Sequence, residues 1–343
     1  MNLELNIAKR YLFSKKSTNA INIISLVSGV AMMFGTMALI LVLSVFNGLE
    51  DLVKSLYAVF YPDIAISAAE GKVFEITPVL QDKIKAIHYM DAYSFTLEEN
   101  ALLEYADKQH ICTMKGVDKN YFKVVNKFDT FMVDGKKMLQ QDSINYCIAG
   151  VGVAQKLGMD PARAYRPIAI YMPKKSSSSF ASMENAFNKN YVTPSGIFAV
   201  SDEFDSRYAF VPLDFFQQLT DNYDKASQVE IRLKNKSDSK ATIQQLQQTL
   251  GKSFIVKSRY EQNETLYKIL KSEKWITFSI LVFIMIIASF NIIGALSMLV
   301  LEKKKDIATL TALGLPSQSI VKIFLLEGVL MSLIGAVTGM ILA

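Results

Sequence analysis

The chain contains 343 residues, of which 51% are hydrophobic and 20% are charged. Its mean hydropathy of +0.23 is high for a soluble protein of this length, so the composition predicts a few membrane spans attached to a sizeable polar domain. The formal net charge is +5, but the basic residues form no stripe with interleaved aromatic residues, which argues against nucleic-acid binding.

The N-terminal region combines a short amphipathic segment with a long uncharged run. Residues 1–16 carry apolar and basic side chains, which predicts a cytoplasmic helix on the membrane surface, with a frayed tail as the alternative. Residues 17–49 contain no charge, and we expect the first transmembrane helix at 20–48. Basic residues precede this run and Glu50 and Asp51 follow it, so the positive-inside rule places the N-terminus in the cytoplasm. Three small residues favour close helix packing here: Ser28, Gly29 and Gly35.

Residues 49–272 are rich in charge and turn signals, and we expect an extracytoplasmic α+β domain with two subdomains. The inserted subdomain is expected at about 110–200. Apolar patterns predict strands at 62–69, 92–98, 100–106, 109–117, 145–149, 167–172, 191–200, 207–211, 228–234 and 254–258. They predict helices at 78–87, 151–158, 212–220 and 238–250. We expect the strands 100–106 and 109–117 to form a hairpin that turns at Asp107-Lys108.

A polar stretch at 173–190, PKKSSSSFASMENAFNKN, separates two of the predicted strands. Its composition fits either a solvated flexible loop or a projecting loop that contacts a partner. Long loops of this kind in compact domains are often either functional or disordered.

Two further apolar runs predict transmembrane helices at 275–301 and 323–343, joined by a cytoplasmic loop at 302–322. Lysines on both sides of the second run give conflicting orientation signals. We follow the first helix, because it usually fixes orientation and long loops translocate regardless of charge. The outer lysines are Lys268, Lys271 and Lys274, and the inner ones are Lys303, Lys304 and Lys305.

The cytoplasmic loop contains a short helical pattern. Ile307, Leu310 and Leu313 recur at helical spacing and share one face, and Gly314 and Pro316 end the helix. Glu327, at the start of the third span, is either a solvated interfacial acid or a packing contact to another helix.

No catalytic or metal-binding pattern is present in the sequence. Residues 251–253 read Gly-Lys-Ser like the end of a P-loop, but Leu246 stands where that motif needs glycine. The potential soft metal ligands are His88, His110, Cys112 and Cys147. Their spacing fits no zinc site, and we interpret the two cysteines as buried free thiols rather than a disulfide.

The chain resembles the lipoprotein-releasing permeases, a branch of the FtsX-like and MacB-like ABC transporter permease superfamily. The resemblance lies in the first helix at 7–50 with its LSVFNG exit, in AGVGVAQKLGMDP at 149–161, and in the second helix, loop and third-helix entry at 290–328. Their spacing also fits, so the resemblance spans the chain. It implies four transmembrane helices, of which three are expected here and the fourth is absent.

The resemblance implies a permease subunit, not an enzyme, in the bacterial inner membrane, with its N-terminus cytoplasmic and its large domain periplasmic. A separate ABC ATPase subunit would hold ATP and Mg²⁺, and this chain would hold no cofactor and bind no nucleic acid. The permease would pair with a second copy or a paralogue among the membrane lipids. It would extract an acylated lipoprotein substrate and pass it to a periplasmic lipoprotein carrier. The alternatives are a MacB-like efflux permease or an FtsX-like signalling permease that regulates cell-wall hydrolases; the large outer domain argues against the latter.

Three groups of site residues follow from this resemblance. The ATPase-coupling helix would use Lys303, Lys304, Lys305, Asp306, Ile307, Leu310, Leu313 and Gly314, for which an ordinary interfacial loop is the alternative. The substrate path would be lined by Met32, Met33, Phe34, Met37 and Phe46, for which lipid-facing packing is the alternative. The carrier-binding loop would present Pro173, Lys174, Lys175, Phe180, Met183 and Phe187.

Overall fold

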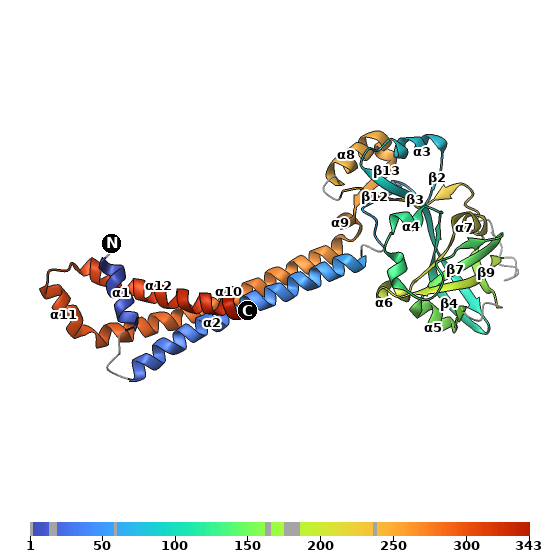
Figure 1. Cartoon of the computed structure of the whole chain (residues 1–343). Coiled ribbons are helices and arrows are strands. Elements are labelled where there is room, and N and C mark those ends of the chain that lie inside the picture. Colours follow the sequence, from blue (N-terminus) through green and yellow to red (C-terminus); the bar gives the residue numbers. More distant parts are fainter. Residues whose placement is uncertain (1–2, 14–18, 58–59, 162–165, 175–185, 236–238) are drawn as a thin grey trace. The chain divides into compact units, whose positions relative to one another are not determined.

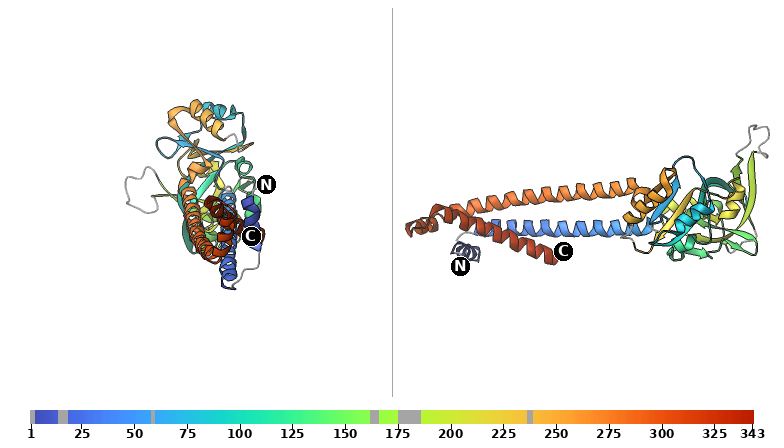
Figure 2. Two further views of the ribbon diagram at one scale, coloured as in Figure 1. Left: turned by 90° about the vertical axis from the view of Figure 1, so that its left-hand side faces the viewer. Right: turned by 90° about the horizontal axis from the view of Figure 1, so that it is seen from above.

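The computed structural model describes the chain except for residues 1–2, 14–18, 58–59, 162–165, 175–185 and 236–238. The chain divides into two compact units. Unit 1 consists of Met1–Asp51 and Thr265–Ala343, and unit 2 consists of Leu52–Glu264. Figure 1 labels the elements of each unit, and Figure 2 shows them from two further sides.

Unit 1 is helical and contains the membrane spans. In the described part of the chain, three helices are long and apolar enough to cross a bilayer, at Leu26–Tyr57, Glu264–Leu301 and Ser317–Leu342. The helices are α1 (Leu3–Phe13), α2 (Asn19–Tyr57), α10 (Glu264–Glu302), α11 (Lys304–Ala312) and α12 (Ser317–Leu342). Helix α2 continues into unit 2 as far as Tyr57, and α10 begins with Glu264, the last residue of unit 2.

Helices α2 and α10 continue beyond their apolar runs, because the polar residues that flank those runs contain neither glycine nor proline. Lys274 of α10 donates a hydrogen bond to the Asn47 side chain at 2.8 Å and pairs with Glu50 at 3.3 Å, both on α2. One of the lysines that conflict with the expected orientation is therefore paired with an acid on the neighbouring helix, just after its apolar run.

Helix α12 packs closely against α2. A Cβ on Gly335 would lie 2.7 Å from the carbonyl oxygen of Gly29, so the two backbones approach too closely for a larger residue. Ser28 is buried as well. The close packing predicted at Ser28 and Gly29 is confirmed, whereas a Cβ on Gly35 would make an ordinary 3.8 Å contact with Met285 of α10.

Glu327 of α12 is fully buried. This burial favours a packing contact with another helix over a solvated acid at the membrane surface.

The first part of unit 2 is an antiparallel sheet in the order β13–β1–β12–β3. Its strands are β1 (Ile64–Ala68), β3 (Met90–Tyr105), β12 (Gln228–Leu233) and β13 (Phe254–Ser258). Two helices that contact each other, α3 (Pro78–Lys85) and α8 (Ser239–Leu250), bury Ile84 and Leu246 in the same core as the strands (Figure 1). Helix α3 begins with Pro78 and is capped by the Thr77 side chain, which accepts a hydrogen bond from the Leu80 amide.

Strand β3 continues from this sheet into a closed six-stranded barrel. Around the ring, the strands follow the order β3–β4–β10–β7–β9–β8, and β8 pairs back with β3. The pairs β4–β10 and β7–β9 are parallel, and the others are antiparallel. The further strands are β4 (Lys108–Val117), β7 (Ile144–Gly150), β8 (Ile168–Pro173), β9 (Phe187–Phe198) and β10 (Tyr208–Pro212).

Shorter elements complete unit 2. They are β2 (Phe74–Glu75), β5 (Met132–Gly135), β6 (Gln140–Gln141), β11 (Lys225–Ala226), α4 (Tyr121–Val124), α5 (Val151–Leu157), α6 (Asp202–Asp205), α7 (Leu213–Leu219), α9 (Arg259–Gln262), and the 3₁₀ turns η1 (Phe128–Phe131) and η5 (Gly251–Ser253). A second, aromatic core holds the segment that follows α2, where Phe60 stacks on Phe204 at 4.0 Å. The Tyr57 hydroxyl donates to Glu203 at 2.6 Å beside it.

The α+β architecture and most of the predicted elements are confirmed, with two corrections. The strands expected at 92–98 and 100–106 form one 16-residue strand, β3. The hairpin expected to turn at Asp107-Lys108 turns one residue earlier, because Tyr105 pairs with Lys108 and Ala106 adopts a φ of +54°.

Candidate functional site

Helix α11 begins in a cluster of charged and aromatic contacts. Lys303 precedes the helix and pairs with Asp306 at 2.9 Å. Its ammonium group lies 5.2 Å from the ring centroid of Tyr11 on α1, within range of a cation–π interaction. Tyr11 in turn lies 6.2 Å from Phe324 of α12. The first lysine of the expected coupling helix is therefore held within unit 1.

The apolar residues of this loop point in different directions. Ile307 packs against a buried cluster of Leu299, Ile320 and Phe324. Leu310 is half-buried, and Leu313 is 77% exposed because it follows the end of α11. The residues expected to share one face are thus divided between an inward and an outward side.

The outward side of the loop carries charge as well as apolar surface. Lys304 and Lys305 are exposed. Gly314, at a φ of +90°, makes the turn after the helix, a conformation that favours glycine. The exposed residues of this loop include Lys304, Lys305 and Leu313, and we call these three the loop surface.

The residues expected to line a substrate path differ in their burial and their neighbours. A Cβ on Gly339 of α12 would lie 2.4 Å from the carbonyl oxygen of Met33, and a Cβ on Gly335 would lie 3.1 Å from the Met32 Cβ, so both methionines lie at the helix interface. Phe34 is 54% exposed. Met37 and Phe46 are half-buried.

The expected carrier-binding loop lies at the end of the β8–β9 hairpin. Pro173 pairs with Phe187, and the Lys174 amide donates to the Ala186 carbonyl at 2.9 Å. Phe187 is 37% exposed. The other expected members lie outside the described residues: Lys175, Phe180 and Met183.

A tyrosine–lysine face lies on the same hairpin and was missed by the sequence reasoning. The Lys189 ammonium lies 4.8 Å from the Tyr171 ring centroid and 5.2 Å from that of Tyr191. The Tyr171 hydroxyl donates to Glu104 of β3 at 3.2 Å. Alternation along β9 could have placed Lys189 and Tyr191 on one side, but the pairing of Tyr171 with Lys189 requires the register.

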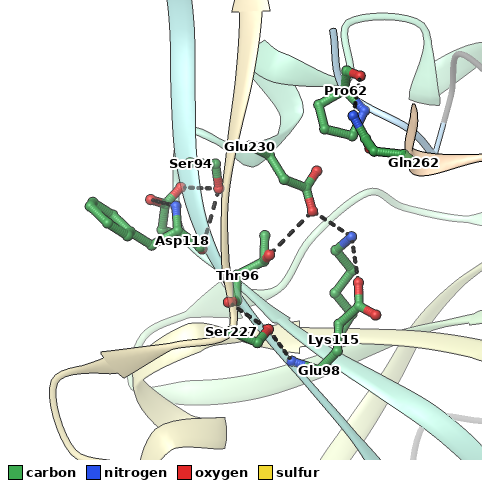
Figure 3. A network of polar contacts seen from close by, with 10 residues as sticks. Pro62, Ser94, Thr96, Glu98, Lys115, Asp118, Ser227, Glu230 and Gln262 are labelled. Atoms are coloured by element: carbon green, nitrogen blue, oxygen red, sulfur yellow. Dashed lines mark hydrogen bonds and ion pairs between the residues drawn. The ribbon is translucent and has the colours of Figure 1, made fainter. Parts of the chain in front are cut away.

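A buried ion cluster spans β3, β4 and β12 (Figure 3). The Lys115 ammonium lies 2.8 Å from Glu98 and 2.6 Å from Glu230, and Thr96 donates to Glu230 at 3.1 Å. Glu230 is fully buried, and this burial raises its pKa despite the attraction of Lys115. The cluster lies where the outer sheet continues into the barrel, so we interpret it as structural.

The described residues contain no group of histidine, cysteine and acidic side chains that could hold a metal ion. Cys112 and Cys147 are both buried and free, which confirms the interpretation of their thiols.

Two family models match the chain. Residues 25–249 match the MacB-like periplasmic core domain, and residues 278–343 match the FtsX-like permease C-terminal region.

Curated relatives match along nearly the whole chain. A "Lipoprotein-releasing system transmembrane protein LolC" from Buchnera aphidicola subsp. Schizaphis graminum is 25% identical, over 98% of this chain and 82% of the relative. A protein of the same name from Neisseria meningitidis is 24% identical, over 99% of this chain and 80% of the relative. A "Lipoprotein-releasing system transmembrane protein LolE" from Haemophilus influenzae is 22% identical, over 100% of this chain and 83% of the relative.

Among solved structures, the extracellular domain of the ABC-type transporter YknZ from Gram-positive bacteria matches with 13% identity and a TM-score of 0.40, over 57% of this chain and 99% of that one. The periplasmic region of MacB from Actinobacillus actinomycetemcomitans matches with 11% identity and a TM-score of 0.41, over 60% of this chain and 92% of that one.

Proposed function

The chain belongs to the FtsX-like permeases with a MacB-like periplasmic core domain, and from this premise we propose that it extracts acylated lipoproteins from the inner membrane and passes them to a periplasmic carrier. It is a permease subunit of an ABC transporter and is not itself catalytic. Similarity to proteins named as lipoprotein-releasing over 98% of the chain, outer domain included, supports this function most directly.

In this function the N-terminus and α11 lie in the cytoplasm and unit 2 lies in the periplasm. The basic N-terminal segment and the acidic pair Glu50 and Asp51 support this orientation. A second permease copy or a paralogue would cover part of the exposed apolar surface of the spans, with membrane lipids over the rest. Phe34, Phe283 and Phe290 are more than half exposed and belong to that surface.

The substrate makes a carrier necessary on physical grounds. Each methylene removed from water stabilises the buried state by about 0.8 kcal/mol, so exposing one acyl chain of roughly fifteen methylenes costs about 12 kcal/mol. An acylated protein therefore has to pass from one apolar environment directly to another.

The loop surface of Lys304, Lys305 and Leu313 is the proposed docking surface for the ATPase. Leu313 is the apolar residue of this surface, and a solvent-exposed leucine beside two lysines fits a contact with another protein better than contact with lipid tails. Ile307 would instead connect the docked helix to α1 and α12, since it packs into their shared cluster.

Replacing Leu313 tests this docking surface. We expect Leu313→Asp to reduce co-purification of the ATPase subunit at least tenfold, because it places a carboxylate in an apolar contact. Val79→Asp is the matched control, since Val79 is 64% exposed and lies in unit 2. Unchanged ATPase binding by Leu313→Asp would remove the loop surface from the interface.

The tyrosine–lysine face is the proposed contact for the carrier, beside the loop that joins β8 and β9. Tyrosine rings that hold a lysine between them offer both apolar area and charge to a partner. We expect Tyr191→Ala to weaken carrier binding by about tenfold, measured by titration of the carrier onto the purified permease complex. Tyr223→Ala is the control, since Tyr223 is similarly exposed on unit 2.

Reconstitution decides the function as a whole. The permease and its ATPase in proteoliposomes should release a triacylated lipoprotein to the carrier only when ATP is present. The same lipoprotein without its acyl chains should be distributed in the same way with and without ATP. ATP-driven movement of a small molecule without lipoprotein release would instead support an efflux permease.

A further inference from the structure

The chain enters unit 2 from α2 and leaves it toward α10 through neighbouring strands. Strand β1 follows α2, and β13 leads through α9 into α10. The two strands pair antiparallel, with Ile64 opposite Ser258. The segments that continue into the first and second membrane spans therefore meet at one point of the outer sheet.

Arg259 binds the incoming segment at this point. Its Nε donates to the Tyr61 carbonyl at 2.9 Å, its guanidinium pairs with the Asp63 carboxylate at 3.0 Å, and its amide donates to the Asp63 carbonyl at 3.1 Å. Gln262, one turn later, donates a hydrogen bond to the Pro62 carbonyl at 3.2 Å. Figure 3 labels Pro62 and Gln262.

Asp63 connects the same point to the sheet. Its second carboxylate oxygen accepts a hydrogen bond from the Leu233 amide at the end of β12, at 3.0 Å. The Asp63 side chain is only 9% exposed and that of Arg259 is 21% exposed, so solvent screens this pair less than a surface ion pair. A planar guanidinium with two engaged donors also fixes direction, which a lysine could not do.

We propose that Asp63 and Arg259 are positioning residues that hold the outer ends of the first two membrane spans together on the outer sheet. Through this pair, a displacement of α2 or α10 driven by the ATPase moves unit 2 instead of separating β1 from β13. This role rests on the proposed transport function. It assigns the pair to the coupling between ATP hydrolysis and lipoprotein release, not to either step alone.

The test compares lipoprotein released with ATP hydrolysed in the complete complex. We expect Arg259→Met to retain ATP hydrolysis near the wild-type rate, while lipoprotein released per ATP falls by about tenfold, the factor that corresponds to one lost charge-assisted hydrogen bond. Arg232→Met is the matched control, because Arg232 forms the same kind of ion pair on the outer sheet, with Asp91, and is 25% exposed against 21% for Arg259. Its pair joins β12 to β3, and neither of these strands leads directly into a membrane span. Its ratio of release to hydrolysis should stay at the wild-type value.

Asp63→Asn provides a second variant that keeps an acceptor for the Leu233 amide and removes only the ion pair. It should lower the same ratio, and it decides the outcome if Arg259→Met fails to fold. If the ratio of lipoprotein released to ATP hydrolysed stays at the wild-type value, the positioning role is wrong. This includes the case in which release and hydrolysis both fall in the same proportion. A wild-type complex that releases no lipoprotein would instead contradict the proposed function.

Discussion

The ammonium group of Lys115 lies within 2.8 Å of Glu98 and 2.6 Å of Glu230, and Lys115 and Glu230 are almost without solvent contact. Lys115→Met should destabilise unit 2 by about 3–5 kcal/mol, because it leaves buried carboxylates without their cation. Equilibrium unfolding in denaturant measures this loss. Lys137→Met is the control: its pair with the exposed Asp129 should contribute less than about 1 kcal/mol.

The pH dependence of this variant follows from the raised pKa of Glu230. Removing the cation raises that pKa further, so the folded variant binds a proton that the unfolded chain releases. Its stability should be greatest below the ordinary glutamate pKa of about 4.5 and fall as pH rises through the folded pKa. The difference in unfolding free energy between the variant and the wild type should therefore become smaller as the pH is lowered from 7 to 4.5. A gap independent of pH would contradict this account.

The two thiols should be unreactive in the folded protein. Burial raises the pKa of Cys147 to about 12 and also raises the pKa of Cys112, so almost no thiolate exists at neutral pH. We expect no maleimide labelling at pH 7 before unfolding and labelling of both cysteines in denaturant, counted by mass spectrometry. Rapid labelling of either thiol in the native protein would show that its strand opens.

At the scale of elements, local sequence signals gave most strands and helices but could not give their partners. The prediction divides strand β3 at Glu99, which lies between the polar residues Glu98 and Asn100. The structure keeps the strand continuous because Glu98 is opposite Lys115 and Asn100 accepts a hydrogen bond from Thr113. Similarly, helical spacing grouped Ile307 with Leu313, although only the tertiary cluster around Phe324 decides which of them turns inward.

The packing of α12 on α2 makes a prediction about glycine. Gly339→Ala should destabilise the membrane helices by about 1–3 kcal/mol, because its Cβ would lie 2.4 Å from the Met33 carbonyl oxygen and the helices would have to separate. Thermal unfolding in detergent measures the change. Gly294→Ala on α10 is the control, since no atom of the described residues lies within 4 Å of a Cβ added there. Equal melting temperatures for both variants would contradict the close α2–α12 contact.

At the scale of the molecule, the long uncharged runs were enough to predict a membrane protein, and charge and turn residues were enough to predict an α+β outer domain. The closed barrel was not predictable in the same way. It depends on Leu102–Glu104 pairing with Ala169–Tyr171, two segments far apart in the sequence. A single sequence contains the strand pattern of each segment, but nothing in it states that these two strands are neighbours.

Because both cores of the outer domain lie between Phe60 and Val256, residues 52–264 should fold without the membrane spans. This fragment should be soluble and unfold in one cooperative transition, followed by circular dichroism in denaturant. Phe210→Asp should abolish the transition, because Phe210 is fully buried in the aromatic core, whereas Val79→Asp should leave it in place. A wild-type fragment that aggregates or unfolds without cooperativity would show that the outer domain needs the spans to hold the ends of β1 and β13 together.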